Sequence, residues 1–351
     1  MIKADYYDKF KCKCGQCRSV CCGGWGITVS DEEYFRLIGL DCPAELRYIL
    51  DCALAVVDDP SPERYAMMKP SYTGKCRLIN EAGLCSLQIA CGEVVLPAVC
   101  RMYPRSLTEN HAGCSASCER VTEMLMRDTP LSFSSHLPEP METYVKALQD
   151  SLSPQSGQLP RRGSHSKASL FEGGGAAERR DGRSLKPLKE RIADLLPDVF
   201  EHGYTYFYFG LLSMYTAIMA EASERFAETV YKDFYAYGKD KDGEERLYKD
   251  IAEFDNRFPE ADKWFENLII NRMLITDFPG EDIKTALCGV VCEYALIRFE
   301  SATCGTEEQF VDKIAALYRY IGHTNFNKNS RAAIERAGAF SSDGLSGLLR
   351  V

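Results

Sequence analysis

Histidine is scarce in this chain of 351 residues, and several familiar catalytic signatures are missing from it. None of its five histidines stands at the spacing of a paired metal ligand: His111, His136, His165, His202 and His323. This excludes a histidine-based hydrolytic metal site and a Ser-His-Asp triad. No G-x-G-x-x-G sequence follows a strand pattern, so the nucleotide-binding fingerprint of Rossmann-type enzymes is absent as well.

Positive charge is also in short supply. The chain has 42 Lys and Arg against 51 Asp and Glu, a net charge of −9, which argues against a general nucleic-acid or anionic-membrane binder. The sequence also gives no sign of export or membrane insertion. Residues 1–11 are charged and have no apolar core, so we expect no secretory signal. The longest uncharged stretch, residues 203–220, is rich in Tyr, Ser and Thr and predicts a buried helix rather than a membrane span. We expect a cytoplasmic protein with no nucleic-acid and no membrane partner.

Cysteine, by contrast, is abundant and unevenly placed. Of 16 cysteines, 13 lie within the first 118 residues. The cytosol keeps thiols reduced, so clustered cysteines there indicate metal ligands rather than a disulfide framework. Five lie between residues 12 and 22 among Lys and Arg, which favour the thiolate form that soft metals bind. A second set follows further along the chain: Cys76, Cys85, Cys91, Cys100, Cys114 and Cys118.

The spacing of these cysteines does not choose the metal. Zinc fingers use two C-x₂-C pairs, and only Cys14 and Cys17 form one here. Iron–sulfur clusters take four cysteines in more varied spacings. Neither the ferredoxin run nor the C-x₃-C-x₂-C spacing of radical enzymes occurs, so zinc and iron–sulfur both stay open. Cys288 and Cys292, four residues apart in an apolar helix pattern, predict core packing.

Composition divides the chain into four parts and predicts a mainly α fold. Residues 1–150 form a loop-rich, cysteine-rich, metal-binding region. Residues 151–186 are rich in Ser, Gly and Arg and predict a disordered linker. Residues 187–335 carry apolar positions at helical spacing, beginning with Leu188, Ile192, Leu195 and Val199, and predict an α-helical region. Residues 336–351 predict a loose tail, and Phe278-Pro279-Gly280 predicts a turn.

The cysteine pattern resembles the flagellin lysine-N-methylases of flagellated bacteria. The resemblance rests on F-x-C-x₄-C-x₃-C-C-x-G-W at residues 10–25, C-x-L-x₅-L-C at 76–85, L-x₃-C-R-x-Y-P-R at 96–105, and Cys118. It covers residues 1–150 strongly. Residues 187–330 match weakly, through Trp264-Phe265-Glu266-Asn267-Leu268 and the following Phe278-Pro279. The same cysteine-rich core is shared with a broader family of zinc- or iron-chelating domains.

The resemblance implies a methyltransferase. It would move a methyl group from S-adenosylmethionine to the ε-amines of flagellin lysines, assisted by a cysteine-ligated [4Fe-4S] cluster, with zinc as the alternative metal. The candidate ligands are Cys12, Cys17, Cys21, Cys22, Cys76, Cys85, Cys100 and Cys118. Arg101 and Arg105 are candidates to hold the carboxylate of the cofactor or, equally, to stabilise a thiolate cluster. No catalytic base is assigned. The alternative function is a non-catalytic zinc- or iron-chelating or redox-sensing protein.

Overall fold

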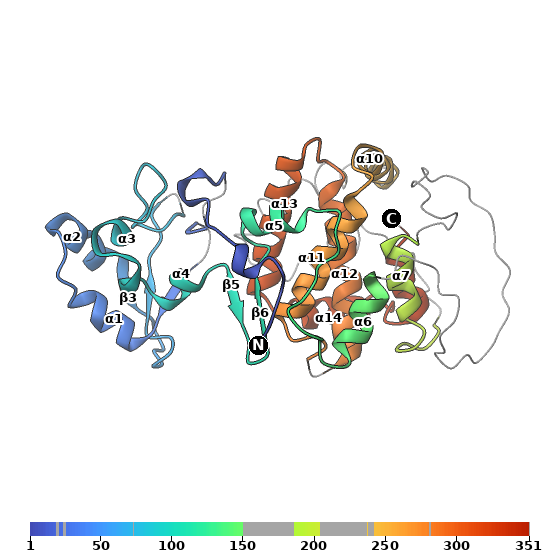
Figure 1. Cartoon of the computed structure of the whole chain (residues 1–351), viewed down its shortest axis with the longest axis horizontal. Helices are drawn as coiled ribbons and strands as arrows, with labels where there is room; N and C mark the ends of the chain where they lie inside the picture. The colour runs from blue at the N-terminus through green and yellow to red at the C-terminus, as the bar shows by residue number, and fades with distance from the viewer. Residues whose placement is uncertain are drawn as a thin grey trace.

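The computed structural model describes residues 1–18, 21–23, 26–72, 74–149, 186–203, 237, 242–280 and 282–350. The predicted linker, apart from Lys186, and the uncharged stretch at residues 203–220, apart from Gly203, lie outside these ranges. The described chain is mainly helical with a loop-rich N-terminal region, which confirms the predicted fold class (Figure 1). Among the described helices, none is long and apolar enough to cross a bilayer.

The N-terminal region contains two small three-stranded sheets. One has the antiparallel order β2-β4-β3, and the other has the order β1-β6-β5 with β1 parallel to β6. The strands are β1 (Ile2–Lys3), β2 (Ile27–Val29), β3 (Leu54–Val56), β4 (Ala66–Met68), β5 (Arg105–Leu107) and β6 (His111–Cys114). The short helices of this region are η1 (Tyr7–Lys9), η2 (Cys14–Gln16), α1 (Asp31–Ile38), α2 (Ala44–Ala53), α3 (Ser86–Cys91), η3 (Glu93–Val95) and α4 (Ala98–Met102). Figure 1 shows α1 to α4 together on one side, with β5 and β6 between them and the larger helices.

The remaining helices form the helical part of the fold. They are α5 (Glu119–Leu125), α6 (Met141–Gln149), α7 (Leu188–Leu195), α10 (Gly243–Arg257), α11 (Ala261–Ile275), α12 (Ile283–Ser301), α13 (Glu307–His323), α14 (Phe326–Arg336) and α15 (Ser342–Leu348). Every residue of α12 from Ala286 to Ser301 is buried, as expected for an interior helix that is apolar on all sides. The helix predicted from Leu188 and Ile192 is α7, with both side chains buried. Cys288 and Cys292 are buried in α12, so the prediction that they pack in the core is confirmed.

Two hydrophobic cores form, and they do not divide at residue 150. The smaller core consists of residues between Ile27 and Leu96. The larger one joins the helices after residue 188 to Ala4, Tyr6 and Phe10 and to residues 114–148. The core of the helical part therefore includes both the start of the chain and the segment that follows the last N-terminal cysteines.

The C-terminal residues differ from the expected loose tail. They form α15, whose Leu345 and Leu348 are buried in the larger core. Its first turn is capped by Ser341, whose hydroxyl accepts a hydrogen bond from the Gly344 amide at 3.1 Å. The composition predicted a loose end because Gly and Ser are frequent here, whereas burial of the leucines stabilises the helix.

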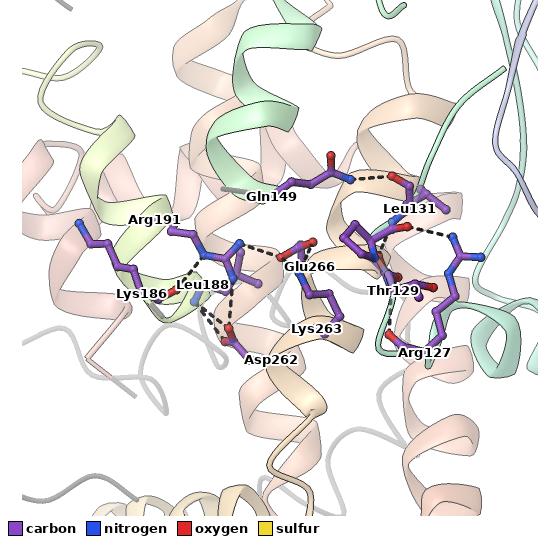
Figure 2. A network of polar contacts seen from close by, with 12 residues as sticks. Arg127, Thr129, Leu131, Gln149, Lys186, Leu188, Arg191, Asp262, Lys263 and Glu266 are labelled. Atoms are coloured by element: carbon purple, nitrogen blue, oxygen red, sulfur yellow. Dashed lines mark hydrogen bonds and ion pairs between the residues drawn. The ribbon is translucent and has the colours of Figure 1, made fainter. Parts of the chain in front are cut away.

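Polar side chains on the buried helix α11 attach neighbouring segments to it (Figure 2). The Asp262 carboxylate accepts the Leu188 amide at 2.9 Å and so caps the N-terminus of α7. Arg191 donates from Nη1 to Glu266 Oε2 at 2.7 Å, and both side chains are almost fully buried. Because removing one partner of such a pair leaves a buried charge, this contact fixes α7 on α11.

Asn267, also on α11, holds the segment that follows α5. Its Nδ2 donates to the carbonyl oxygens of Leu125, Arg127 and Thr129 at 3.1, 3.2 and 3.1 Å. Its Oδ1 accepts the Leu131 amide at 2.8 Å. Asn267 is fully buried, so these bonds satisfy backbone groups that have little access to water.

A third polar group joins α11, α12 and α13. Glu293 of α12 accepts a hydrogen bond from the Tyr318 hydroxyl at 2.5 Å and one from Arg272 Nη1 at 3.2 Å. Burial raises the pKa of Glu293 from 4.5 to about 7, although Arg272 and Tyr318 act in the opposite direction. The carboxyl is therefore partly protonated near neutral pH.

This burial predicts that Glu293 contributes to the pH dependence of stability. Between pH 4.5 and about 7 the folded state retains a proton that the unfolded state has released. The contribution of Glu293 to the free energy of unfolding is thus fully present below pH 4.5 and is lost as the pH rises through 7. The loss amounts to about 3 kcal/mol. Urea unfolding of the wild type and Glu293→Gln across this range is the measurement. We expect the stability difference between them to change by that amount, and a constant difference contradicts the assignment.

Candidate functional site

Four of the predicted ligands, Cys12, Cys17, Cys21 and Cys118, form what we call the first cysteine group. Cys12 and Cys17 lie on either side of η2, and Cys118 immediately precedes α5. Burial, with contributions from the neighbouring charges of Glu119, Cys118 and Cys12, raises the pKa of Cys17 to about 12. Burial also raises the pKa of Cys118, with contributions from Cys12 and Cys21. These thiols therefore lie within electrostatic range of one another.

The other four predicted ligands, Cys22, Cys76, Cys85 and Cys100, form the second cysteine group. The Cys76 amide donates to the Cys22 carbonyl at 2.7 Å, which brings residues 22 and 76 side by side. Cys85 immediately precedes α3, and Cys100 lies within α4. Burial raises the pKa of Cys100 to about 12, with contributions from Cys76 and Cys85. Local turns thus bring together thiols that are up to 78 positions apart in the chain.

The adjacent residues Cys21 and Cys22 connect the two groups. Their Sγ atoms are 3.7 Å apart. The hydrogen bond with Cys22 lowers the pKa of Cys21 to about 7, and the Arg319 guanidinium on α13 favours the same thiolate. The charge of Cys21 also acts on Cys76 and Cys100. Cys21 therefore links the first cysteine group electrostatically to the second.

The remaining N-terminal cysteines lie apart from this arrangement or at its edge. Burial and the neighbouring Cys42 raise the pKa of Cys91, and Cys114 is fully buried in β6. Cys52 is exposed on α2. Cys14 is exposed beside Cys12, and its amide donates to Cys12 Sγ at 3.2 Å. Cys14 thus lies next to Cys12 of the first cysteine group, and Cys118 of the same group acts electrostatically on Cys114.

Ion pairs attach the cysteine-bearing loop to the helical part. Lys13 Nζ lies 2.7 Å from Glu123 and 3.7 Å from the buried Glu119, both on α5. Arg18 pairs with Asp312 of α13 at 2.9 Å. The latter pair is exposed, so its contribution to stability is small, about 0.2–1 kcal/mol. The two contacts hold Lys13 and Arg18, which lie on either side of η2, against α5 and α13.

The two predicted cofactor-binding arginines have different surroundings. The Arg105 guanidinium lies over the rings of Phe10 and Tyr7, with centroid distances of 5.2 and 5.9 Å. It also favours the thiolate form of Cys114. Arg101 is half-buried on α4, one residue after Cys100. Both arginines border the cysteines, and a role in holding a cofactor carboxylate stays a prediction.

The donor set fits a soft metal or an iron–sulfur cluster. The two cysteine groups supply eight thiols, Arg319 acts on one of them, Cys21, and thiolates are the ligands of zinc and of iron–sulfur clusters. Among the described residues, no three Cys, His, Asp or Glu side chains converge as the ligands of a single ion. The chemistry of the donors supports a cysteine-ligated group without selecting iron or zinc.

Comparison with known proteins identifies the helical part. The model of the FliB lysine N-methylase C-terminal domain matches residues 133–348. The chain belongs to this family. The resemblance deduced from the cysteines is thereby confirmed, and the family match falls on the α-helical region, where the sequence resemblance was weaker.

Individual relatives of the FliB family are distant. A lysine-N-methylase of Salmonella typhimurium is 25% identical over 127 residues, which are 35% of this chain and 31% of the relative. The flagellar biosynthetic protein FliU of Salmonella muenchen is 26% identical over 123 residues, which are 34% of this chain and 72% of FliU. The match thus spans about a third of the length of the lysine-N-methylase. No solved structure matches the chain.

Sequence reasoning missed the buried polar residues of α11, α12 and α13. Arg272 and Glu293 stand within long apolar helices, where the spacing of apolar residues drew attention to core packing. A charged residue that is flanked on both sides by buried apolar residues is itself a signal, because it is stable only with a partner.

Proposed function

We propose that this protein is a protein-lysine N-methyltransferase of the cytoplasm that methylates flagellin with S-adenosylmethionine. The observation that carries the proposal is the match of residues 133–348 to the FliB lysine N-methylase domain. The names of the relatives, lysine-N-methylase and flagellar biosynthetic protein FliU, support the reaction and the flagellar substrate. The proposal includes a [4Fe-4S] cluster held by four of the eight thiols in the two cysteine groups.

The reaction requires the substrate lysine to be neutral. The lysine nitrogen attacks the sulfonium methyl carbon, the carbon–sulfur bond breaks, and methyllysine and S-adenosylhomocysteine form as the amine loses a proton. Since a free lysine has a pKa near 10.4, the site must favour the neutral amine, which low polarity and neighbouring cations do. A bound cluster supplies redox and Lewis-acid chemistry at its irons. The protein's own thiols position it, and Arg319 stabilises the negative charge of Cys21.

The test is a methylation assay on protein purified without oxygen. We expect about four irons and four sulfides per chain, a visible absorption band, and transfer of methyl groups from S-adenosylmethionine to flagellin lysines detected by mass spectrometry. Zinc in place of iron, with no methylated flagellin, contradicts the proposal. That result supports the second candidate, a non-catalytic metal-chelating protein, which the gathering of eight thiols favours independently of the family match.

A further inference from the structure

The exposed apolar side chains of this protein gather in the part of the chain that carries most of the cysteines. Among the described residues, all the large apolar side chains that are exposed lie within the first 107 positions. The described helices that follow residue 107 bury their large apolar side chains instead, most of them in the larger core. Apolar side chains that gather on one part of a surface indicate an interaction site, whereas single exposed ones do not.

One group of these side chains is continuous and lies on α1. Phe35 is 61% exposed, and its ring contacts the rings of Tyr34 and Tyr65 at centroid distances of 5.3 and 5.6 Å. The rings of Tyr34 and Tyr65 are themselves 5.2 Å apart. Ile38, also exposed, follows Tyr34 and Phe35 by one helical turn. We call Tyr34, Phe35, Ile38 and Tyr65 the aromatic face.

Carboxylates border the aromatic face. Asp31 and Glu32 lie one helical turn before Phe35 on α1. The Asp31 amide donates to the Pro62 carbonyl at 2.9 Å, so the loop that precedes Tyr65 borders the start of α1. Three exposed carboxylates belong to this loop: Asp58, Asp59 and Glu63. Residues 31–64 contain nine Asp and Glu but only three Arg and no Lys, so this part of the surface is negative.

Two of these three arginines make contacts within the fold. Arg36 donates to the Leu96 carbonyl at 3.4 Å. Arg47 donates to the Leu37 carbonyl at 2.8 Å and pairs with Asp51 at 2.7 Å. Their guanidinium groups are therefore directed to backbone carbonyls and to Asp51 rather than to the carboxylates that border the aromatic face.

The aromatic face is fixed to the segment that carries Cys100. Glu33 of α1 caps its own helix together with Ser30, and its Oε1 accepts the Ala98 amide of α4 at 2.6 Å. Cys100 lies two residues further along α4 and belongs to the second cysteine group. A partner bound to α1 is thus held at the cysteine-bearing part of the chain, on the side away from the larger helices (Figure 1).

We propose that the aromatic face and the carboxylates around it dock a lysine-bearing surface of the protein substrate. The inference rests on the proposed function and assigns the surface that recognises the substrate. A lysine side chain matches both parts of this surface, because its ammonium group is attracted to carboxylates and to aromatic rings while its methylene chain covers apolar area. A second copy of this chain fits less well, since a symmetric contact here sets the same carboxylates against one another.

The experiment measures binding of the full chain to flagellin monomers by biolayer interferometry. We expect Phe35→Ser to weaken binding about tenfold, because it removes the most exposed ring of the aromatic face. We expect Glu32→Lys to weaken it about threefold at low salt, and this effect should disappear at high salt, where the charges are screened. In the methylation assay both changes should raise the KM for flagellin and leave kcat unchanged.

Two exposed positions outside the aromatic face provide matched controls. Ile89 on α3 is 62% exposed, and Figure 1 shows α3 apart from α1. Glu109 is exposed in the turn between β5 and β6. We expect Ile89→Ser and Glu109→Lys to leave the affinity for flagellin unchanged. Equal losses in these controls contradict the assignment, because they mean that any change on this part of the surface weakens binding.

The outcomes separate this inference from the proposed function. Wild-type affinity in both Phe35→Ser and Glu32→Lys overturns the docking surface, while methylation of flagellin by the wild type still upholds the activity. Conversely, a wild type that binds flagellin through this face but transfers no methyl group upholds the docking surface and overturns the activity. Sedimentation tests the remaining occupant: a dimeric wild type and a monomeric Phe35→Ser variant show an interface between copies and overturn the inference.

Discussion

Replacing Cys21 by serine is expected to remove the bound metal and to lower the rate of flagellin methylation by at least about 100-fold. Cys21 connects the two cysteine groups, since it contacts Cys22 and acts electrostatically on Cys76, Cys100 and Cys118. Its thiolate, favoured by Arg319, has the lowered pKa expected of a ligand to a soft metal. A serine hydroxyl stays protonated near neutral pH and does not replace it. Iron content and initial rate are measured on protein prepared without oxygen.

The matched control for Cys21 is Cys52→Ser. Cys52 is exposed on α2 and is not among the predicted ligands, so its replacement should leave iron content and rate at wild-type values. Iron content and rate within twofold of the wild type in Cys21→Ser contradict ligation by the first cysteine group. Comparable losses in both variants indicate general thiol damage instead. Thermal unfolding of each variant separates loss of the metal from loss of the fold.

Asn267→Ala is expected to lower the free energy of unfolding by about 3–5 kcal/mol. The amide makes hydrogen bonds with four backbone groups between residues 125 and 131, and alanine makes none of them. The carbonyls of Leu125, Arg127 and Thr129 and the Leu131 amide then lose a partner at a site where Asn267 is fully buried. Denaturant unfolding measures the change. We expect the affected segment, which follows α5 and Cys118, to gain amide hydrogen exchange as well.

The control for Asn267 is Asn110→Ala, at an exposed loop position, where a change within about 0.5 kcal/mol is expected. A loss of less than about 1 kcal/mol in Asn267→Ala contradicts the assigned role, because it means that water or a neighbouring group replaces the amide. Asn267→Leu tests the same point while filling more of the space. It should be destabilising also, since the four backbone groups stay unpaired.

The two parts of the chain depend on each other through α11. Asn271 of this helix donates to the Cys114 carbonyl at 3.0 Å, and Asn267 holds the segment that follows α5. The cysteine-bearing loop is attached to α5 and α13 in turn. Destabilising α11 should therefore disturb the cysteine groups without any change in a thiol. This dependence explains why apolar residues at the start of the chain belong to the same core as the helices that follow residue 188.

The sequence by itself determined the fold class, the helices with strong periodicity and the eight cysteines predicted as metal ligands. Apolar residues at intervals of three and four lie on one face of a helix, which is why α7 was predictable. The cysteine pattern likewise pointed to the family that residues 133–348 confirm. These features were predictable because each depends on residues that lie close together in the sequence.

Only the tertiary structure decided which distant residues meet. Nothing in the local sequence places Cys76 beside Cys22 or Arg319 near Cys21, because these contacts arise when segments far apart in the chain pack together. The contact of Phe35 on α1 with Tyr65, which precedes β4, forms in the same way. The α15 helix was missed for a related reason: its Gly and Ser residues predict a loose end, and burial of Leu345 and Leu348 in a core built elsewhere overrides that preference.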